Sequence, residues 1–450
     1  MHVSDNLTYK KIFIFWIPLA LTWFMMTVEQ PYLMAVIARL GEAKYNLAAF
    51  GIAYSFALII EAPVIMLMSA STALVKNKDA YLKLRQFTFI LNVSVTLIMI
   101  VGLTPPVFYF ITEDVIGLPG HIARLTHLTS IIMIPWAGAI GYRRFYQGIL
   151  IRNNLTRRVT YGTIIRLVFM SATALIGYII GLKGAYTAAI ALVMGVVCEA
   201  GASRVMAWKS VKSLLEESDT AESERTSLSY KFILSFYTPL ALTSVISLGV
   251  HPIATFFMGR SRLAIESLAV LPVVNALVFI FRSIGLSYQE VNIALIGEKN
   301  QNYKMLKNFA VILGVGVLLG LSVMAFSPLA RVWFRNVSGL TEELTRLSYL
   351  PLKILVLLPV LTVWISFQRG ILVHARNTKP ITVATAIELF TITIILYVTV
   401  FYIRIPGVVG AACAYLIGKL LANLYLVPKQ IQAARIRTNM HTINIGRLKQ

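Results

Sequence analysis

The chain has 450 residues, of which 58% are hydrophobic and 13% are charged, and its formal net charge is +22. Soluble domains carry about 25% charged residues, so this composition excludes an ordinary soluble protein. Several apolar stretches exceed the roughly 20 residues that a membrane-spanning helix needs, and the strict alternation of a transmembrane β-barrel is absent. We therefore expect an all-α polytopic membrane protein.

Twelve membrane spans are predicted along the chain. They cover residues 12–36, 47–75, 87–111, 127–151, 159–181, 185–208, 232–256, 265–295, 308–330, 349–373, 381–403 and 407–428. The opening segment MHVSDNLTYKK does not form a cleavable signal peptide, so the first span is expected to be retained.

The positive charge indicates the orientation of these spans. With both termini in the cytoplasm, the inner segments hold 24 Lys and Arg residues and the outer segments hold 10. This asymmetry follows the positive-inside rule, and contacts with lipid headgroups add to it. We therefore expect a multi-pass protein of the cell (inner or plasma) membrane, with cytoplasmic N- and C-termini and no nucleic-acid partner.

The sequence contains an internal repeat. The segment YKKIFIFWIPLALT (9–22) aligns with YKFILSFYTPLALT (230–243), 145–167 aligns with 367–389, and 184–195 aligns with 407–418. Each copy has six predicted spans, an even number, so both copies point the same way through the membrane. We expect two pseudo-symmetric six-helix lobes, 1–208 and 232–428, joined by a cytoplasmic linker (209–231) and followed by a basic cytoplasmic tail (429–450). Transporters built from such parallel repeats bind substrate between the halves.

Charged residues inside the predicted spans are the candidate functional residues, because each must face protein or water. The basic ones are Arg143, Arg144, Arg166, Arg282, Lys353, Arg369 and Lys419, and the acidic ones are Glu29, Glu61, Glu199, Glu290 and Glu388. Guanidinium groups suit phosphate and carboxylate, so the predicted substrate-binding residues are Arg282, Arg166, Arg144, Arg143, Gln289, Asn292 and Arg369. The alternative for Arg143, Arg144 and Arg369 is that they extend from span ends toward the cytoplasmic headgroups.

Four acids are the candidates for ion coupling or gating: Glu29, Glu61, Glu388 and Glu290. Glu29 is the best single candidate for a proton or sodium site, and the alternative is a structural hydrogen bond beside Pro31.

Opposite charges occupy equivalent positions of the repeat. Glu61 aligns with Arg282, and Arg166 aligns with Glu388. These residues form either ion pairs across the lobes, which would hold one conformation, or local pairs within each lobe. The glycines of the Ala-rich stretches are expected to permit close helix packing; they are Gly184, Gly195, Gly407 and Gly418.

Two stretches carry a family resemblance. They are AFGIAYSFALIIEAPVIMLMSASTALVKN (49–77) and the segment from Pro135 through QGILIRNN to Gly162. With the duplicated six-helix plan, the chain resembles the superfamily of multidrug, oligosaccharidyl-lipid and polysaccharide (MOP) exporters. Within it, these stretches are similar to the progressive ankylosis protein family. The resemblance implies two six-helix lobes around a central cavity opened alternately to each side, and export of anionic metabolites such as pyrophosphate, nucleotide or citrate.

The predicted function is therefore alternating-access secondary export of an anionic or amphipathic organic solute through a central cavity between the lobes. The alternatives are a flippase for a lipid-linked saccharide or phospholipid, and a multidrug exporter coupled to H⁺ or Na⁺. Common hydrolase, zinc and nucleotide motifs are absent from the sequence, so we expect neither an enzyme nor a cofactor or metal. The expected partners are membrane lipids and a small-molecule or amphipathic substrate, and the protein is expected to be a monomer.

Overall fold

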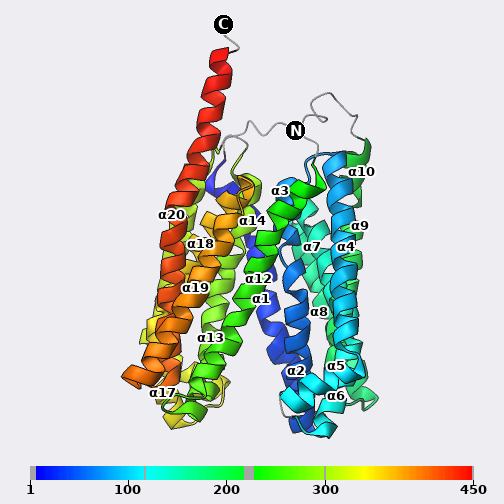
Figure 1. Ribbon diagram of the computed structural model, residues 1–450, viewed down its shortest axis with the longest axis vertical. Coiled ribbons are helices and arrows are strands. Elements are labelled where there is room, and N and C mark those ends of the chain that lie inside the picture. The colour runs from blue at the N-terminus through cyan, green and yellow to red at the C-terminus, as the bar shows by residue number, and fades with distance from the viewer. Residues whose placement is uncertain (1–6, 116–117, 217–227, 298–299, 448–450) are drawn as a thin grey trace. The chain divides into compact units, whose positions relative to one another are not determined.

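The computed structural model describes residues 7–115, 118–216, 228–297 and 300–447. Helices make up nearly all of these residues (Figure 1), and no strand occurs among them beyond one isolated bridge between Arg262 and Pro406. The expectation of an all-α protein is confirmed.

The first repeat begins with a long helix and contains several interrupted ones. Its helices are α1 (Tyr9–Ile37), α2 (Ala43–Glu61), η1 (Ala62–Val64), α3 (Leu67–Leu74), α4 (Lys78–Gly102), α5 (Pro105–Tyr109), η2 (Phe110–Val115), α6 (Gly120–Ile132), α7 (Pro135–Arg152), α8 (Thr156–Ile179), α9 (Gly184–Met206) and α10 (Trp208–Glu216).

The second repeat follows the same order. Its helices are α12 (Tyr230–Met258), α13 (Ala264–Leu286), α14 (Tyr288–Leu295), α15 (Tyr303–Phe326), α16 (Leu329–Arg331), η3 (Val332–Val337), α17 (Glu342–Ile354), η4 (Leu355–Leu357), α18 (Leu358–His374), α19 (Lys379–Tyr397), η5 (Val398–Ile403) and α20 (Gly407–Arg447).

The interruptions of the helices repeat as well. The second span of each copy is broken near its end, between α2 and α3 at Pro63 and between α13 and α14 at Ser287. A π-helical turn follows the third span of each copy, η2 starting at Phe110 and η3 starting at Val332. The two copies thus share local irregularities as well as sequence, which confirms the pseudo-symmetry.

Within the described residues, eleven helical segments are long and apolar enough to span a membrane. The expected span 127–151 is not one of them, because α6 ends at Ile132 and α7 starts at Pro135. Proline has no backbone N–H to continue the helix, and α7 also carries Arg143, Arg144 and Arg152, which make it too polar for an apolar span. Segment α6–α7 therefore takes the place of the twelfth span.

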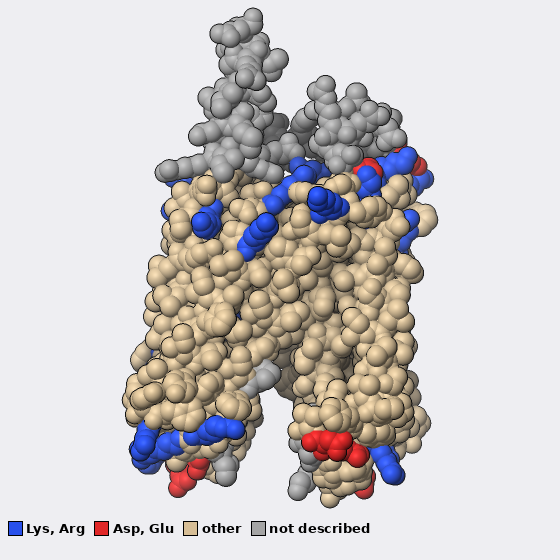
Figure 2. Space-filling model, in the orientation of Figure 1, with Lys and Arg blue, Asp and Glu red and all other residues tan. Residues whose placement is uncertain are grey.

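Apolar side chains cover the outside of the helices. Ile179, Val205 and Phe390 are among the most exposed large hydrophobic residues. On the face shown in Figure 2, the Lys, Arg, Asp and Glu residues gather at the ends of the helices, with an uncharged surface between. This pattern is what lipid contact requires.

The described chain forms two compact units. One unit comprises Met1–Phe24 with Val245–Gln450, and the other comprises Met25–Ser244. Helices α1 and α12 are therefore each divided between the units, at equivalent points of the repeat. Each unit is one repeat in which the first half of its own first helix is replaced by the corresponding half-helix of the other repeat.

Side-chain contacts within each unit hold the exchanged half-helices. In the first half of α1, Trp16 donates from Nε1 to Ser287 Oγ at 2.9 Å and packs edge-on against Phe309. In the first half of α12, Tyr237 donates from its hydroxyl to the Pro63 carbonyl oxygen at 2.6 Å. Because Trp16, Tyr237 and their partners Ser287 and Phe309 are buried, the exchanged segments are integral parts of the units they join.

Candidate functional site

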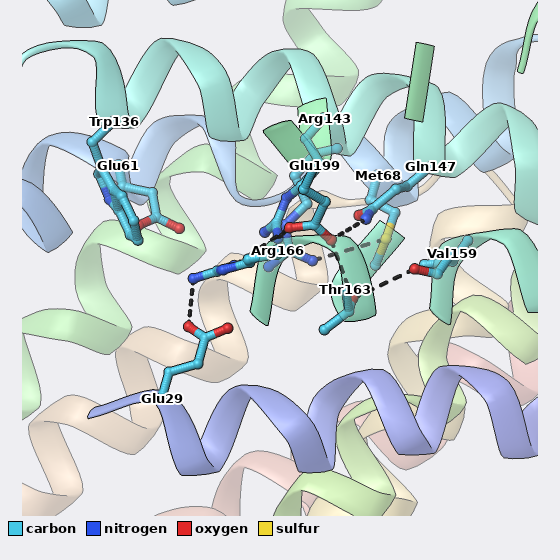
Figure 3. A network of polar contacts seen from close by, with 11 residues as sticks. Glu29, Glu61, Met68, Trp136, Arg143, Gln147, Val159, Thr163, Arg166 and Glu199 are labelled. Carbon is cyan, nitrogen blue, oxygen red and sulfur yellow. Dashed lines mark hydrogen bonds and ion pairs between the residues drawn. The ribbon is translucent and has the colours of Figure 1, made fainter. Parts of the chain in front are cut away.

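Six charged side chains interact in the unit Met25–Ser244, and we call them the balanced network; Figure 3 labels all of them except Arg144. They come from α1, α2, α7, α8 and α9, and all are buried: Glu29, Glu61, Arg143, Arg144, Arg166 and Glu199.

Glu199 is the centre of the balanced network. Arg143 donates from Nη1 to Glu199 Oε2, and Arg166 Nη1 lies 3.6 Å from the same oxygen. Gln147 Nε2 and Thr163 Oγ1 each donate to Glu199 Oε1 at 3.1 Å. The carboxylate has no solvent exposure, and two cations and two neutral donors replace the water it lost on burial.

Arg166 connects this centre to α1. Its Nη2 donates to Glu29 Oε2 at 2.5 Å, and its guanidinium carbon lies 5.6 Å from the centre of the Trp136 ring. Trp136 in turn donates from Nε1 to Glu61 Oε2 at 2.9 Å. One arginine thus bridges carboxylates of α1 and α9, as the fork geometry of guanidinium allows.

The charges of this network balance, with three carboxylates against three guanidinium groups. Arg144 completes the set, and its Nη1 lies 3.8 Å from Met68 Sδ. Glu29 Oε1 is buried and has no hydrogen-bond partner in the described part of the chain. A balanced network has little capacity for a further permanent charge, but Glu29 Oε1 has a position at which a proton can be held.

A second cluster lies in the other unit, and we call it the cationic cluster. It comprises Arg282 of α13, Arg369 of α18, Glu388 of α19 and Lys419 of α20. Lys419 Nζ and Glu388 Oε1 form an ion pair at 2.5 Å, and about a tenth of each side chain is exposed. Glu388 also interacts electrostatically with Arg369 and Arg282.

Neutral hydroxyl groups are the hydrogen-bond partners of the two arginines in the cationic cluster. Arg282 donates from Nε to Thr362 Oγ1 at 3.3 Å, and Arg369 donates from Nη2 to Thr385 Oγ1 at 2.9 Å. Among the described residues, Glu388 is the one carboxylate that acts on the three cations. The cluster therefore has two positive charges in excess.

Close packing holds the aligned residues Arg166 and Glu388 in position. A Cβ atom on Gly195 would lie 2.9 Å from the Arg166 carbonyl oxygen, and one on Gly418 would lie 3.0 Å from the Glu388 carbonyl oxygen. The same holds for Gly184 beside Ile37 (2.9 Å from Cγ2) and for Gly407 beside Ser261 (2.2 Å from Oγ). The expectation that these glycines permit close helix packing is confirmed.

Helix α14 holds the remaining predicted residues: Gln289, Glu290 and Asn292, all buried. Asn292 donates from Nδ2 back to the Tyr288 carbonyl oxygen at 2.7 Å. A Cβ atom on Gly370 of α18 would lie 2.6 Å from Asn292 Cβ and 2.9 Å from the Gln289 carbonyl oxygen. These contacts place α14 directly against α18.

Glu61, Arg166 and Glu388 have partners within their own units, and Arg282, the fourth residue for which a pair across the lobes was an alternative, has a neutral partner in Thr362. Glu61 bonds to Trp136, Arg166 pairs with Glu29 and Glu199, and each pair lies within one unit. Glu388 likewise pairs with Lys419 in its own unit. Each of these four residues therefore has a hydrogen-bond or ion-pair partner in its own unit, although Arg282 lacks a carboxylate of its own.

Glu199 and Lys419 have central positions that the sequence interpretation did not assign. Both appear there as charges inside spans, and neither has a charged counterpart: in the repeat alignment Glu199 meets Ala422 and Lys419 meets Val196. This lack of a charged counterpart was the sequence signal that could have identified the two residues. A buried charge in a membrane span needs a partner, and here the other repeat offers no equivalent charge.

Comparison with known proteins identifies the fold through solved structures. No protein-family model matches the chain, and no curated protein matches its sequence. Among solved structures, an outward-facing multidrug resistance MATE family transporter of the MOP superfamily has a TM-score of 0.76 at 17% identity, covering 96% of this chain and 99% of its own. The chain has the fold of the MOP-superfamily transporters.

Two further structures share this MOP fold. A MOP superfamily transporter from Pyrococcus furiosus has a TM-score of 0.74 at 15% identity, covering 95% of this chain and 99% of its own. The eukaryotic MATE transporter AtDTX14 has a TM-score of 0.74 at 14% identity, covering 96% of this chain and 98% of its own. MATE transporters have twelve helices in two lobes. The eleven spans of the described residues, together with the segment α6–α7, give this chain the same number of spanning segments.

Proposed function

We propose that this protein is a secondary transporter that works by alternating access and exports an anionic or amphipathic organic solute, such as a phosphorylated or carboxylated metabolite. The observation that carries the proposal is the excess of two positive charges in the cationic cluster of Arg282, Arg369, Lys419 and Glu388. A buried excess of charge is costly unless a counter-ion binds there.

The arginines of this cluster can bind an anion. Arg282 makes a single hydrogen bond, from Nε, in the described part of the chain, so both terminal nitrogens remain as donors. Arg369 Nε is buried and has no hydrogen-bond partner among the described residues. Guanidinium groups with unused N–H donors can bind carboxylate and phosphate oxygens, which accept charge-assisted hydrogen bonds.

A solved relative in fold supports a departure from the multidrug branch. The transporter from Pyrococcus furiosus is described as having a binding pocket of reverse polarity, which suggests a different function. We infer that the excess of cations here marks a similar departure, toward the anionic substrates that the resemblance to the progressive ankylosis family implies. On this proposal both termini are cytoplasmic and the direction is outward across the cell membrane.

Coupling to an ion gradient is the second part of the proposal. Glu29 Oε1 has no hydrogen-bond partner within the described residues although it is buried. A carboxylate oxygen in this state can take up a proton without breaking an existing hydrogen bond. We infer that Glu29 couples transport to H⁺ through its ion pair with Arg166.

Transport into proteoliposomes tests the proposal. Purified protein is first screened by thermal stabilisation against anionic metabolites, lipid-linked phosphates and cationic drugs, because a ligand of the folded state raises the melting temperature. Radiolabelled uptake of the stabilising compound is then compared for wild type, Arg282→Gln and Arg369→Gln. Arg346→Gln is the matched control, since that arginine is largely exposed.

We expect anionic metabolites to stabilise the wild type and to be transported, and both cluster variants to lose these properties while the control keeps them. Stabilisation by cationic drugs alone, lost in Glu29→Gln, would overturn the proposal in favour of a cation-coupled multidrug exporter. Stabilisation by lipid-linked phosphates alone would indicate a flippase.

A further inference from the structure

Helices α8 and α19 carry buried charges of opposite sign at aligned positions of the repeat, and each charge pairs with the helix that follows it. In the balanced network, α8 supplies the cation Arg166 and α9 supplies the anion Glu199. In the cationic cluster, the equivalent helix α19 supplies the anion Glu388 and α20 supplies the cation Lys419. Both pairs lie beside a glycine that brings the two helices together, Gly195 or Gly418. The sign of the charge therefore reverses at the aligned position of Arg166 and Glu388, whereas Glu199 and Lys419 lie at different positions of α9 and α20 in the repeat alignment.

The surroundings of the two carboxylates differ in one respect. Glu199 accepts hydrogen bonds from Arg143, Gln147 and Thr163 and forms an ion pair with Arg166, so it is held from several directions. The hydrogen bonds and ion pairs of Glu388 in the described part of the chain come from Lys419 alone. Glu388 is thus the less constrained carboxylate, and its side chain is partly exposed where that of Glu199 is not.

We propose that Glu388 occupies the anion site when substrate is absent, and that the anionic group of the substrate displaces it from Lys419. The inference rests on the proposed function, because it describes how the same cluster takes its substrate. It adds Lys419 as a substrate-binding residue and gives Glu388 the role of an internal competitor.

Charge matching defines the class of ligand. Three cations and Glu388 leave two positive charges, whereas the balanced network shows that a buried cluster of this scaffold can be charge-neutral. An anion with two negative charges restores that balance even while Glu388 stays ionised, and a monovalent anion does not. The site therefore takes a small organic or inorganic dianion.

The hydrogen-bond partners of the arginines support the exchange. Thr362 and Thr385 are neutral acceptors, and both hydroxyl groups also donate to carbonyl oxygens of their own helices, those of Leu358 and Ile381. An anionic oxygen would give each guanidinium a charge-assisted bond, which is shorter and stronger. When Glu388 leaves, the three donors of the Lys419 ammonium become available to the same anion.

Other ionisable groups near the cluster define the conditions of the test. His251 of α12 and Tyr415 of α20 both interact electrostatically with Arg282. Binding is therefore measured at a single pH of about 7.5, at which most of a phosphate group is divalent, so that the comparison concerns the variants alone.

Anion binding to the full-length protein in lipid nanodiscs tests the inference, with inorganic phosphate as the divalent probe and acetate as the monovalent probe. We expect Glu388→Gln to bind phosphate about tenfold more tightly than wild type, and Lys419→Gln to bind it about tenfold less tightly, within the range of common coupling factors. Lys419→Arg should keep binding, which shows that the charge is responsible. Glu343→Gln and Lys379→Gln, both at exposed positions, are the matched controls and should bind as wild type does.

The outcomes separate this inference from the proposed function. If no anion binds or is transported by the wild type, the proposed function is wrong. If phosphate binds the wild type but Glu388→Gln binds it no more tightly, Glu388 is not an occupant of the site and only this inference is overturned. Equal affinity for acetate and phosphate would overturn the charge-matching step. A Glu388→Gln protein that is unstable without phosphate but stable with it would support displacement.

Discussion

The balanced network and the cationic cluster occupy equivalent places in the two repeats, yet one is neutral and the other is not. In the first, Arg143 and Arg166 share Glu199, and each charge has a partner within the unit. In the second, Lys419 and two arginines share Glu388. The duplicated scaffold thus contains a charge-balanced polar core in one copy and an excess of cations in the other. The two copies share their helices and close-packing glycines, and they differ in the charges that those helices carry.

The largest expected effect is on stability in the balanced network. Glu199→Gln leaves Arg143 without its buried carboxylate, and breaking a buried ion pair costs about 3–5 kcal/mol in the free energy of unfolding. We expect a clearly lower thermal unfolding midpoint in nanodiscs.

Glu388→Gln is the matched comparison for this variant. Its midpoint should fall less, because Glu388 is held less tightly, and inorganic phosphate should restore it. If phosphate restores Glu199→Gln equally well, the two sites do not differ as proposed.

The next largest effect concerns the glycines beside the ion pairs. Gly195→Ala and Gly418→Ala place a methyl group about 3 Å from a backbone carbonyl oxygen of the neighbouring helix, and such overpacking costs about 1–3 kcal/mol. Both variants should unfold at lower temperature. Gly201→Ala in the same helix α9 is the control, because no heavy atom lies within 4 Å of its Cβ position. A control that is destabilised as much would show that helix propensity, not close packing, explains the result.

Hydropathy and the repeat predict most of this fold because membrane spans must satisfy their backbone internally and present apolar side chains to lipid. The short helices α5 and α16 and the division between α6 and α7 were not predicted. They depend on prolines and on charges such as Arg143 and Arg144, whose burial is possible only with partners from other helices.

The buried charges themselves were predictable because they are costly in a membrane, but their pairing was not. Local pairs and pairs across the lobes were equally compatible with the sequence for Arg166 and Glu388. Only the rotation and depth of each helix decide that Arg166 reaches Glu29 and Glu199. Periodicity places a residue on a helix face, and it does not say which neighbouring helix that face meets.

A smaller effect on stability, with a distinct readout, is expected for Glu29. Arg166 keeps its interaction with Glu199 when Glu29 is replaced, so Glu29→Gln should fold. If Glu29 carries the coupling proton, uptake by the wild type will change with an imposed pH gradient and uptake by Glu29→Gln will not. Glu42→Gln, at an exposed position after α1, should respond as the wild type does. If uptake by Glu29→Gln responds to the pH gradient as the wild type does, the balanced network takes no part in coupling and its role is purely structural.

The smallest expected effects come from two equivalent threonines, and they sharpen the comparison most directly. Thr163 donates to Glu199, whereas Thr385 accepts from Arg369. Thr163→Val should lower the free energy of unfolding by about 1 kcal/mol, the usual net contribution of one hydrogen bond, without changing the affinity for phosphate. Thr385→Val should change that affinity, because Arg369 loses the group that orients it, with a smaller effect on the unfolding midpoint. Both properties can be measured on the same nanodisc samples. If the two variants change the same property by the same amount, then the charges around these threonines do not separate a structural lobe from a binding lobe.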